Sequence, residues 1–257
     1  AKAWSTLADI DPIQLSTQVA REVLFQADVA PEDLDHIVWG TVVCVTHAPN
    51  VGREVALDLG LYRTPAFTVS RACATGFEAV ASGARLILCG EADTVLTGGV
   101  DVTSAAPVPY GKEVIDKLQA LQKAKGFSAM TTLAQVNPLD LLPSPPTVSE
   151  RYTGKTMGAH AEEMAVYFDI AREAQDRFAL GSHKKAAAAI EAGHIQAQIA
   201  AALAPRGYVR EDNIVRSTMA MEKLASLNPV FSKPHGTITA ATSSALTDGA
   251  ASILLMS

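Results

Sequence analysis

One stretch, residues 65–99, constrains the fold of this chain more than any other: PAFTVSRACATGFEAVASGARLILCGEADTVLTGG. It opens with a short alternating apolar run, Ala66–Val69, that is typical of a buried strand. Apolar residues then recur at helical spacing as far as Leu88, and Gly90 follows as a helix stop. The run 94–96, before the paired glycines, predicts a second strand. A strand, a helix and a strand in this order form a βαβ unit, which predicts a parallel sheet.

Cys73 lies where this strand gives way to the helix, in the predicted first helical turn. The unpaired N–H groups and the dipole of a helix N-terminus stabilise a thiolate, so this position favours a nucleophile. Gly76, which follows closely, leaves the sulfur without a neighbouring side chain. The alternative is a structural thiol, because free cysteine is among the most buried residue types. The position favours the nucleophile but does not by itself exclude the structural thiol.

The composition argues against several classes of function. The chain has 257 residues, 48% hydrophobic and 19% charged, enough for one large core or two smaller ones. Its 21 basic and 27 acidic residues give a net charge of −6, which argues against a nucleic-acid surface. We expect no membrane span, since no apolar run approaches about twenty residues, and no signal peptide, since the first residues, AKAWSTLADIDPIQL, lack successive charged, apolar and small-residue regions. The three cysteines, with no CxxC pair and no metal-ligand spacing, predict an intracellular chain with reduced thiols.

The rest of the chain predicts further helices and strands. Asp11 and Pro12 form a start signal for a helix that runs to about Phe25. The other expected elements are a strand at 36–43, a short helix at 51–60, a long helix at 170–193, and two strands joined by a small-residue turn within 236–257.

Residues 105–149 form the least regular stretch of the sequence. They contain six prolines and a basic amphipathic segment. A connection of this length inside a compact domain is usually functional, so we expect a lid or an assembly arm. A disordered insertion is disfavoured by its large apolar residues, which are Leu118, Leu121, Phe127, Leu133, Leu139, Leu141 and Leu142.

The two ends of the sequence predict a piece of a longer protein. The first residue is Ala1 rather than Met, and no strand precedes the first helix. The last residues, SILLMS, end on an apolar strand pattern. We therefore expect an opening strand and a further segment outside this sequence.

Five motifs, in family order and spacing, resemble those of the thiolase family. Several motifs in register are a far more specific signal than one short pattern. They resemble most closely the degradative 3-ketoacyl-CoA thiolases of trifunctional-protein β-subunit type. The motifs are VSRACATGFEAV around Cys73, GEADTVLTGGVD at 90–101, MGAHAEEMA at 157–165, LNPVF at 227–231 and KPHGTITAATSSALTDGAA at 233–251.

The resemblance implies an α/β layered fold. Its five-stranded mixed sheet lies between helices on both faces, and a loop domain is inserted after the paired glycines. We assign residues 1–104 to the first part of the N-terminal thiolase domain, 105–232 to the inserted loop domain and its helices, and 233–257 to the end of the N-terminal domain. The second half of a thiolase, with its His-bearing and second Cys-bearing motifs, is absent from this sequence.

The resemblance also assigns roles to seven residues. Cys73 matches the nucleophile, which cleaves a 3-ketoacyl-CoA, releases acetyl-CoA, and passes the acyl group from its thioester to a second coenzyme A. In the family, a His of the second half takes the thiol proton and another Cys there protonates the enolate. Coenzyme A is thus a substrate, and no permanently bound cofactor or metal is implied. The coenzyme A contacts that match are Met157, Arg216, Leu227, Phe231, Ala240 and Ser244, with Arg216 near the nucleotide end and the others along the pantetheine.

Two residues depart from the family pattern. Thr242 stands where the family has asparagine, which is expected to alter the hydrogen bonding under the pantetheine. His160 stands where the family has threonine, which is expected to affect a helix cap or to place an imidazole near the pocket. Both departures bear on the preference for acyl-chain length.

Three functions from different classes compete. The first is a thiolase of fatty-acid β-oxidation, or one that runs the reverse Claisen condensation. The second is a non-catalytic thiolase-like acyl-CoA-binding or assembly subunit, which would not need a thiol at the helix corner. The third, a condensing ketosynthase, is weakened by motifs that follow thiolase patterns. For the thiolase, the resemblance implies a homodimer or dimer of dimers, a possible hydratase/dehydrogenase subunit as partner, and a cytoplasmic location in bacteria or a mitochondrial one in eukaryotes.

Overall fold

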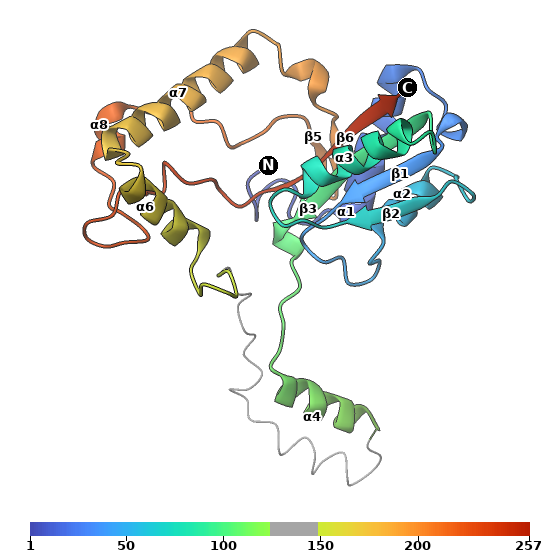
Figure 1. The fold of residues 1–257 in the computed structure, drawn as a ribbon, viewed down its shortest axis with the longest axis horizontal. Coiled ribbons are helices and arrows are strands. Elements are labelled where there is room, and N and C mark those ends of the chain that lie inside the picture. Colours follow the sequence, from blue (N-terminus) through green and yellow to red (C-terminus); the bar gives the residue numbers. More distant parts are fainter. Residues whose placement is uncertain (124–148) are drawn as a thin grey trace. The chain divides into compact units, whose positions relative to one another are not determined.

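The computed structural model describes residues 1–123 and 149–257 (Figure 1). The chain divides into two compact units, Ala1–Ala106 with Ala161–Ser257, and Pro107–His160. The helices are α1 (Pro12–Ala27), α2 (Val51–Asp58), α3 (Thr75–Leu88), α4 (Lys112–Lys123), α6 (Met157–Tyr167), α7 (Arg172–Glu191) and α8 (Met221–Ala225). The strands are β1 (His36–Gly40), β2 (Ala66–Val69), β3 (Thr94–Val102), β4 (Ala202–Ala204), β5 (Gly207–Val209) and β6 (Asp248–Met256). Short 3-10 helices lie at Pro31–Asp33, Thr103–Ala105 and Gln196–Gln198.

The main sheet of the larger unit has the strand order β2-β1-β3-β6 (Figure 1). β1 pairs in parallel with both β2 and β3, which confirms the parallel βαβ unit expected from the sequence. β6 pairs antiparallel with β3 along the whole length of both strands, from Thr94 opposite Met256 to Val102 opposite Asp248. The sheet is therefore mixed, as the family resemblance implies. It has four strands in the described chain rather than five, because the residues before α1 add only a single bridge, Lys2 to Thr247.

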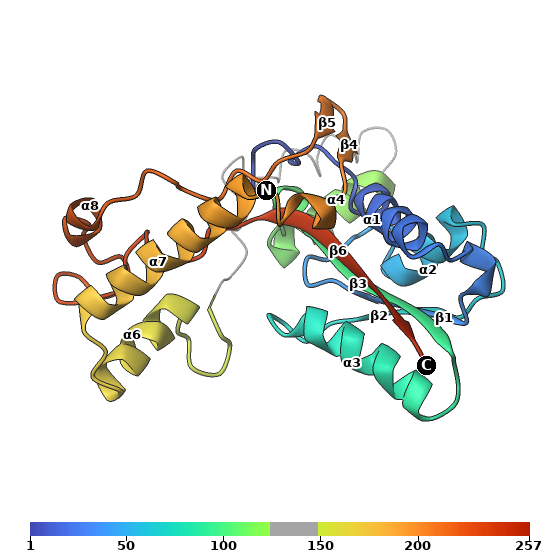
Figure 2. The same ribbon diagram turned by 90° about the horizontal axis from the view of Figure 1, so that it is seen from above.

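Helices cover both faces of this sheet (Figure 2). α1 and α2 pack on one face, where Leu15, Val55 and Trp39 belong to the larger apolar core. α3 packs on the other face, over a second core that contains Val38 and Ala79. Val38 and Trp39 are adjacent and point to opposite faces, as the twofold alternation of a strand requires. The layered α/β architecture expected from the sequence is thus confirmed.

Two helix starts follow from local chemistry. Asp11 caps α1: its carboxylate accepts the N–H groups of Ile13 and Gln14, and Pro12 occupies the first helical position. Asn50 caps α2 by accepting the N–H of Arg53. These side chains satisfy N–H groups that have no partner inside the helix.

β3 differs from its predicted extent, because it continues through Gly98 and Gly99 instead of ending before them. A Cβ on Gly98 would lie 2.5 Å from the ring of Trp39 and 2.7 Å from the carbonyl oxygen of Ala251. The glycine therefore lets the buried indole and the neighbouring strand approach closely, and it does not break the strand. Trp39 is fully buried, and its indole N–H donates to the hydroxyl of Ser16 at 3.1 Å.

Two other strand predictions differ from the structure, one in its end and one in its existence, for a shared reason. β1 ends at Gly40 rather than near residue 43, and no strand forms at 236–240. In the first case the carboxylate of Asp101 accepts the N–H groups of Val42 and Val43. In the second, the carboxylate of Glu162 accepts those of Thr237 and Ile238. Each carboxylate thus accepts backbone N–H groups that would otherwise form the hydrogen bonds between paired strands.

The long helix expected near 170–193 is confirmed as α7. Of the irregular stretch 105–149, the structure describes α4, in which Val114 is buried while Ile115 and Leu118 are each 42% exposed. Phe127, Leu133, Leu139, Leu141 and Leu142 lie outside the described residues, so the expected ordered arm stays a prediction. In the described parts of the chain, no helix has the length and apolar character to cross a membrane.

We predict that Gly98→Ala lowers the free energy of unfolding by about 1–3 kcal/mol, because the added methyl overpacks the contact with Trp39. The matched control is Gly181→Ala in α7, where a Cβ meets nothing within 4 Å. The control should leave stability unchanged or raise it by up to about 1 kcal/mol, since alanine is the better helix former. Urea unfolding of the purified variants measures both, and a Gly98→Ala protein as stable as wild type would contradict the prediction.

Candidate active site

A strained corner between β2 and α3 presents Cys73. Ala72, the preceding residue, has φ +46°, in the left-handed region that non-glycine residues rarely adopt. The hydroxyl of Thr75 accepts the N–H of Arg71 at 2.7 Å and donates to the carbonyl of Ala72 at 2.6 Å. The corner therefore delays the start of α3 to Thr75, and Cys73 lies two residues before the helix rather than in its first turn. Its side chain is exposed, which disfavours the purely structural thiol.

Cys73 lines an open cavity of about 610 Å³ in the larger unit. The walls come from the corner, the start of α3, β3 and β6. Glycines at Gly40, Gly98 and Gly99 contribute backbone without side chains, and a Cβ on Gly99 would lie 2.9 Å from the carbonyl oxygen of Gly40. Phe77 adds an aromatic side chain that is 84% exposed. The cavity is thus a largely apolar recess beside a thiol, which suits an acyl group.

Asp101 also lines this cavity. One oxygen of its carboxylate accepts the hydroxyl of Thr41 at 3.1 Å and the N–H groups of Val42 and Val43 at 2.8 and 2.7 Å. Asp101 is the last residue of the motif at 90–101, but the sequence alone predicted no role for it. The signal that could have identified it is an acidic residue in an otherwise uncharged strand, two residues after the paired glycines.

An ion-pair cluster ties the corner to α3. The carboxylate of Glu78 forms ion pairs with the guanidinium groups of Arg85, at an N–O distance of 2.9 Å, and of Arg71, at 2.5 Å. The hydrogen bond from Arg85, and then that from Arg71, lower the pKa of Glu78 from 4.5 to about 2. Because Arg71 precedes Ala72 in the strained turn, this cluster anchors one side of the corner that carries Cys73.

Four of the six predicted coenzyme A contacts lie on two neighbouring segments. Ala240 and Ser244 are exposed on one, and half-buried Leu227 and 40%-exposed Phe231 lie on the other. The two segments are joined by a backbone hydrogen bond from Val230 to Ile238 at 2.9 Å.

Arg216 and Met157, the remaining two, lie apart from these segments in the chain. Arg216 is exposed, and its backbone N–H donates to Nδ1 of His183 at 3.2 Å. Met157 begins α6 within the smaller unit and is 55% exposed. Of the five predicted contacts in the larger unit, none lines the Cys73 cavity. Their assignment to coenzyme A stays a prediction.

The two departures from the family pattern have local partners. Thr242 accepts the N–H of Thr239 at 2.9 Å through its hydroxyl, so it stabilises the turn that precedes Ser244. His160 places Nε2 3.1 Å from the hydroxyl of Thr153. The hydroxyl of Thr156 caps the start of α6 by accepting the N–H of Ala159, so that cap does not depend on His160.

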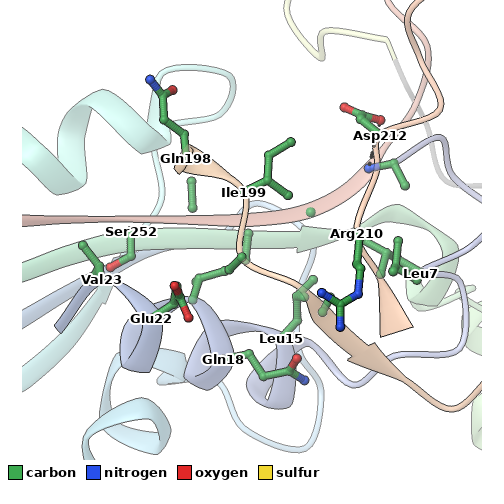
Figure 3. Close-up of a pocket in the computed structure, with 18 of the residues that line it drawn as sticks. Leu7, Leu15, Gln18, Glu22, Val23, Gln198, Ile199, Arg210, Asp212 and Ser252 are labelled. Carbon is green, nitrogen blue, oxygen red and sulfur yellow. Dashed lines mark ion pairs between the residues drawn. The ribbon is translucent and has the colours of Figure 1, made fainter. Parts of the chain in front are cut away.

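A second cavity, of about 520 Å³, lies between α1, β6 and residues 197–212 (Figure 3). Its lining includes Gln18, Glu22, Arg210 and Asp212. Neither Cys73 nor any predicted coenzyme A contact of the larger unit is among its lining residues, so we do not assign it to the candidate site.

We predict that Cys73 is alkylated first by limiting iodoacetamide at neutral pH. All three cysteines, Cys44, Cys73 and Cys89, are free and exposed, so exposure alone does not rank them. Cys73 lies beside the N-terminus of α3, whose dipole favours a thiolate, and Cys89 is the C-cap of the same helix, where the dipole disfavours one. Mass spectrometry of the labelled peptides gives the order, with Cys73→Ser as control. Faster labelling of Cys44 or Cys89 in the folded protein would contradict this.

We predict an acid-sensitive contribution of Glu78 to stability. Its pKa is lowered by folding, so its contribution is complete above about pH 4.5 and is lost as the pH falls towards 2. The difference in unfolding midpoint between wild type and Glu78→Gln should therefore be present at pH 7 and shrink between pH 4.5 and 2. Urea unfolding over this range measures it, and a difference that does not depend on pH would be the contrary result.

Comparison with known proteins agrees with these features. The family model "Thiolase, N-terminal domain" matches residues 2–257. The chain is 36% identical over 261 residues to a 3-ketoacyl-CoA thiolase of Shewanella sediminis and 39% identical over 261 residues to one of Yersinia enterocolitica. Each alignment covers 100% of this chain and 60% of the relative.

A solved structure agrees as well. The crystal structure of human mitochondrial 3-ketoacyl-CoA thiolase in complex with CoA superposes with a TM-score of 0.82 at 27% identity, over 100% of this chain and 62% of that one. The chain thus spans about 60% of the length of the curated relatives. The family inferred from the sequence motifs is confirmed: this chain belongs to the thiolase family and corresponds to its N-terminal domain.

Proposed function

We propose that the protein containing this chain is an acetyl-CoA C-acyltransferase that cleaves 3-ketoacyl-CoA in fatty-acid β-oxidation, or catalyses the reverse Claisen condensation. The observation that carries the proposal is the exposed thiol of Cys73 in a recess of about 610 Å³ at a strained corner. The relatives named 3-ketoacyl-CoA thiolase support the same class of substrate.

In the proposed reaction, the thiolate of Cys73 attacks the keto carbonyl of the substrate. The bond between the carbonyl carbon and its α-carbon breaks, the enolate of acetyl-CoA leaves and takes up a proton, and an acyl thioester remains on Cys73. The thiolate of a second coenzyme A then attacks this thioester, which releases the shortened acyl-CoA and restores the cysteine. The largely apolar lining of the recess suits the acyl chain that remains on Cys73.

Coenzyme A is proposed to bind along the two joined segments described above. Leu227, Phe231 and Ala240 supply apolar contacts to the pantetheine, and Ser244, whose side chain is exposed, supplies a hydrogen bond. Met157 is proposed, from the motif match alone, as a further apolar contact to the pantetheine. Arg216 supplies positive charge for the nucleotide end, which an acidic protein needs locally to bind an anionic ligand.

Assembly and location are proposed from the family resemblance alone. They comprise a homodimer or dimer of dimers, a hydratase/dehydrogenase subunit as a possible partner, and a cytoplasmic location in a bacterium or a mitochondrial one in a eukaryote. The assignment to the trifunctional-protein β-subunit type is likewise proposed from the motif resemblance alone.

The test is thiolysis of acetoacetyl-CoA by the full gene product that contains this chain, followed by the loss of enolate absorbance. Cys73→Ser should lower kcat by about 10³-fold or more, because it removes the nucleophile, whereas Cys89→Ser should retain activity. Brief incubation of wild type with acetyl-CoA should leave an acetyl group on the Cys73 peptide. A protein that binds coenzyme A in calorimetry but neither turns over nor acylates would instead be a non-catalytic binding subunit.

A further inference from the structure

Glu162, in α6, is a buried acid with no role in the reaction described above. Only 6% of it is exposed, and its carboxylate faces backbone rather than solvent. One oxygen accepts the N–H of Ile238 at 2.7 Å and the other accepts the hydroxyl of Thr237 at 3.0 Å. The N–H of Thr237 reaches both oxygens, at 2.9 and 2.8 Å. Hydrogen bonds from this many donors stabilise the charged form of a buried carboxylate.

The charge state of Glu162 agrees with this geometry. Burial alone would raise the pKa of the carboxyl group. The N–H groups of Thr237 and Ile238, the hydroxyl of Thr237 and the nearby guanidinium of Arg172 together outweigh burial and hold the pKa below its ordinary value. The carboxylate is thus ionised at neutral pH and accepts hydrogen bonds from Thr237 and Ile238.

The chain opposite Glu162 is shaped to receive the carboxylate. A Cβ on Gly236 would lie 2.5 Å from Oε1 of Glu162 and 2.6 Å from the carbonyl oxygen of Ser232. Gly236 therefore gives the acid room to reach the two amides that follow. Gln175 of α7 donates to the hydroxyl of Thr237 at 3.0 Å, so a second helix fixes the same residue.

The anchored residues lead directly into the segment proposed to contact pantetheine. Thr239 is fully buried, and its N–H donates to the hydroxyl of Thr242 at 2.9 Å. The hydroxyl of Ser243 donates to the carbonyl of Thr239 at 2.8 Å. This closed turn carries exposed Ala240 on one side and exposed Ser244 at its end. A shift at Thr237 therefore moves both proposed contacts together.

We propose that Glu162 is a positioning residue for coenzyme A: its carboxylate holds residues 237–238 and thereby sets the pantetheine-binding segment 239–244. This inference rests on the proposed function for the identity of the ligand. The carboxylate acts through the backbone and does not touch the reacting atoms. Its loss should therefore weaken binding of coenzyme A more than it slows the chemical step.

The central experiment compares Glu162→Gln with Glu173→Gln in the full gene product. Glutamine has the size of glutamate, but its NH₂ group would face a backbone donor, so the anchor is broken without a cavity. We expect the KM for coenzyme A to rise about tenfold, with kcat changed less than about twofold, as for loss of hydrogen bonding that holds a binding site. Glu173 is an exposed acid paired with Arg177, and Glu173→Gln should leave both constants within about twofold of wild type.

Two further measurements keep the inference falsifiable. Thr237→Val keeps the anchoring N–H but removes one hydroxyl donor, so the KM for coenzyme A should rise by only about two- to fourfold. Hydrogen exchange at the amides of Thr237 and Ile238 should be faster in Glu162→Gln than in wild type, and this readout needs no activity. An unchanged KM in an active Glu162→Gln or Thr237→Val enzyme, or equal exchange rates, overturns the inference. A wild-type protein without thiolysis or coenzyme A binding overturns the proposed function instead.

Discussion

The close contact between Trp39 and Gly98 is the constraint on which the main sheet depends. Trp39 is fully buried, and its ring occupies the space that a side chain at position 98 would need. The glycine also lets the carbonyl of Ala251 on β6 approach, so β3 can pair on both edges without interruption. As a result β3 runs unbroken to Val102 and carries Asp101 to the lining of the Cys73 cavity.

Local patterns were sufficient to predict most of the layered core. The 65–99 stretch contains its strand, helix and strand signals in sequence order, and those elements depend mainly on burial of one face. The errors occurred where a distant side chain competes for backbone donors. Asp101 ends β1 by binding the amides of Val42 and Val43, and Glu162 replaces an expected strand by binding Thr237 and Ile238. Local periodicity cannot predict these hydrogen bonds, because the acid lies about 60 or 75 positions from the amide that it binds.

For the candidate site, the sequence predicted the position of the thiol but not the local structure around it. Cys73 could be proposed as the nucleophile from the sequence, because a thiol at a strand-to-helix junction has few structural uses. The shape of the corner could not be predicted, because it depends on the left-handed conformation of Ala72, and alanine has no turn preference of its own. The proposed coenzyme A contacts followed from motif resemblance alone. Their relation in space depends on the hydrogen bond from Val230 to Ile238, which no motif encodes.

The magnitudes at the corner indicate that Cys73 is held in place before any substrate binds. A non-glycine residue in the left-handed region costs about 1–2 kcal/mol, and Ala72 bears this cost. The hydroxyl of Thr75 makes two hydrogen bonds across the turn, each contributing about 0.5–1.5 kcal/mol. The two hydrogen bonds together are comparable to the conformational cost, so the turn needs no ligand to maintain it. Because Thr75 is also 95% buried against the sheet side of α3, with its methyl 2.7 Å from where a Cβ on Gly40 would lie, the corner cannot shift without repacking β1. The thiol is therefore presented by the folded core itself, which is the preorganisation that the proposed covalent catalysis requires.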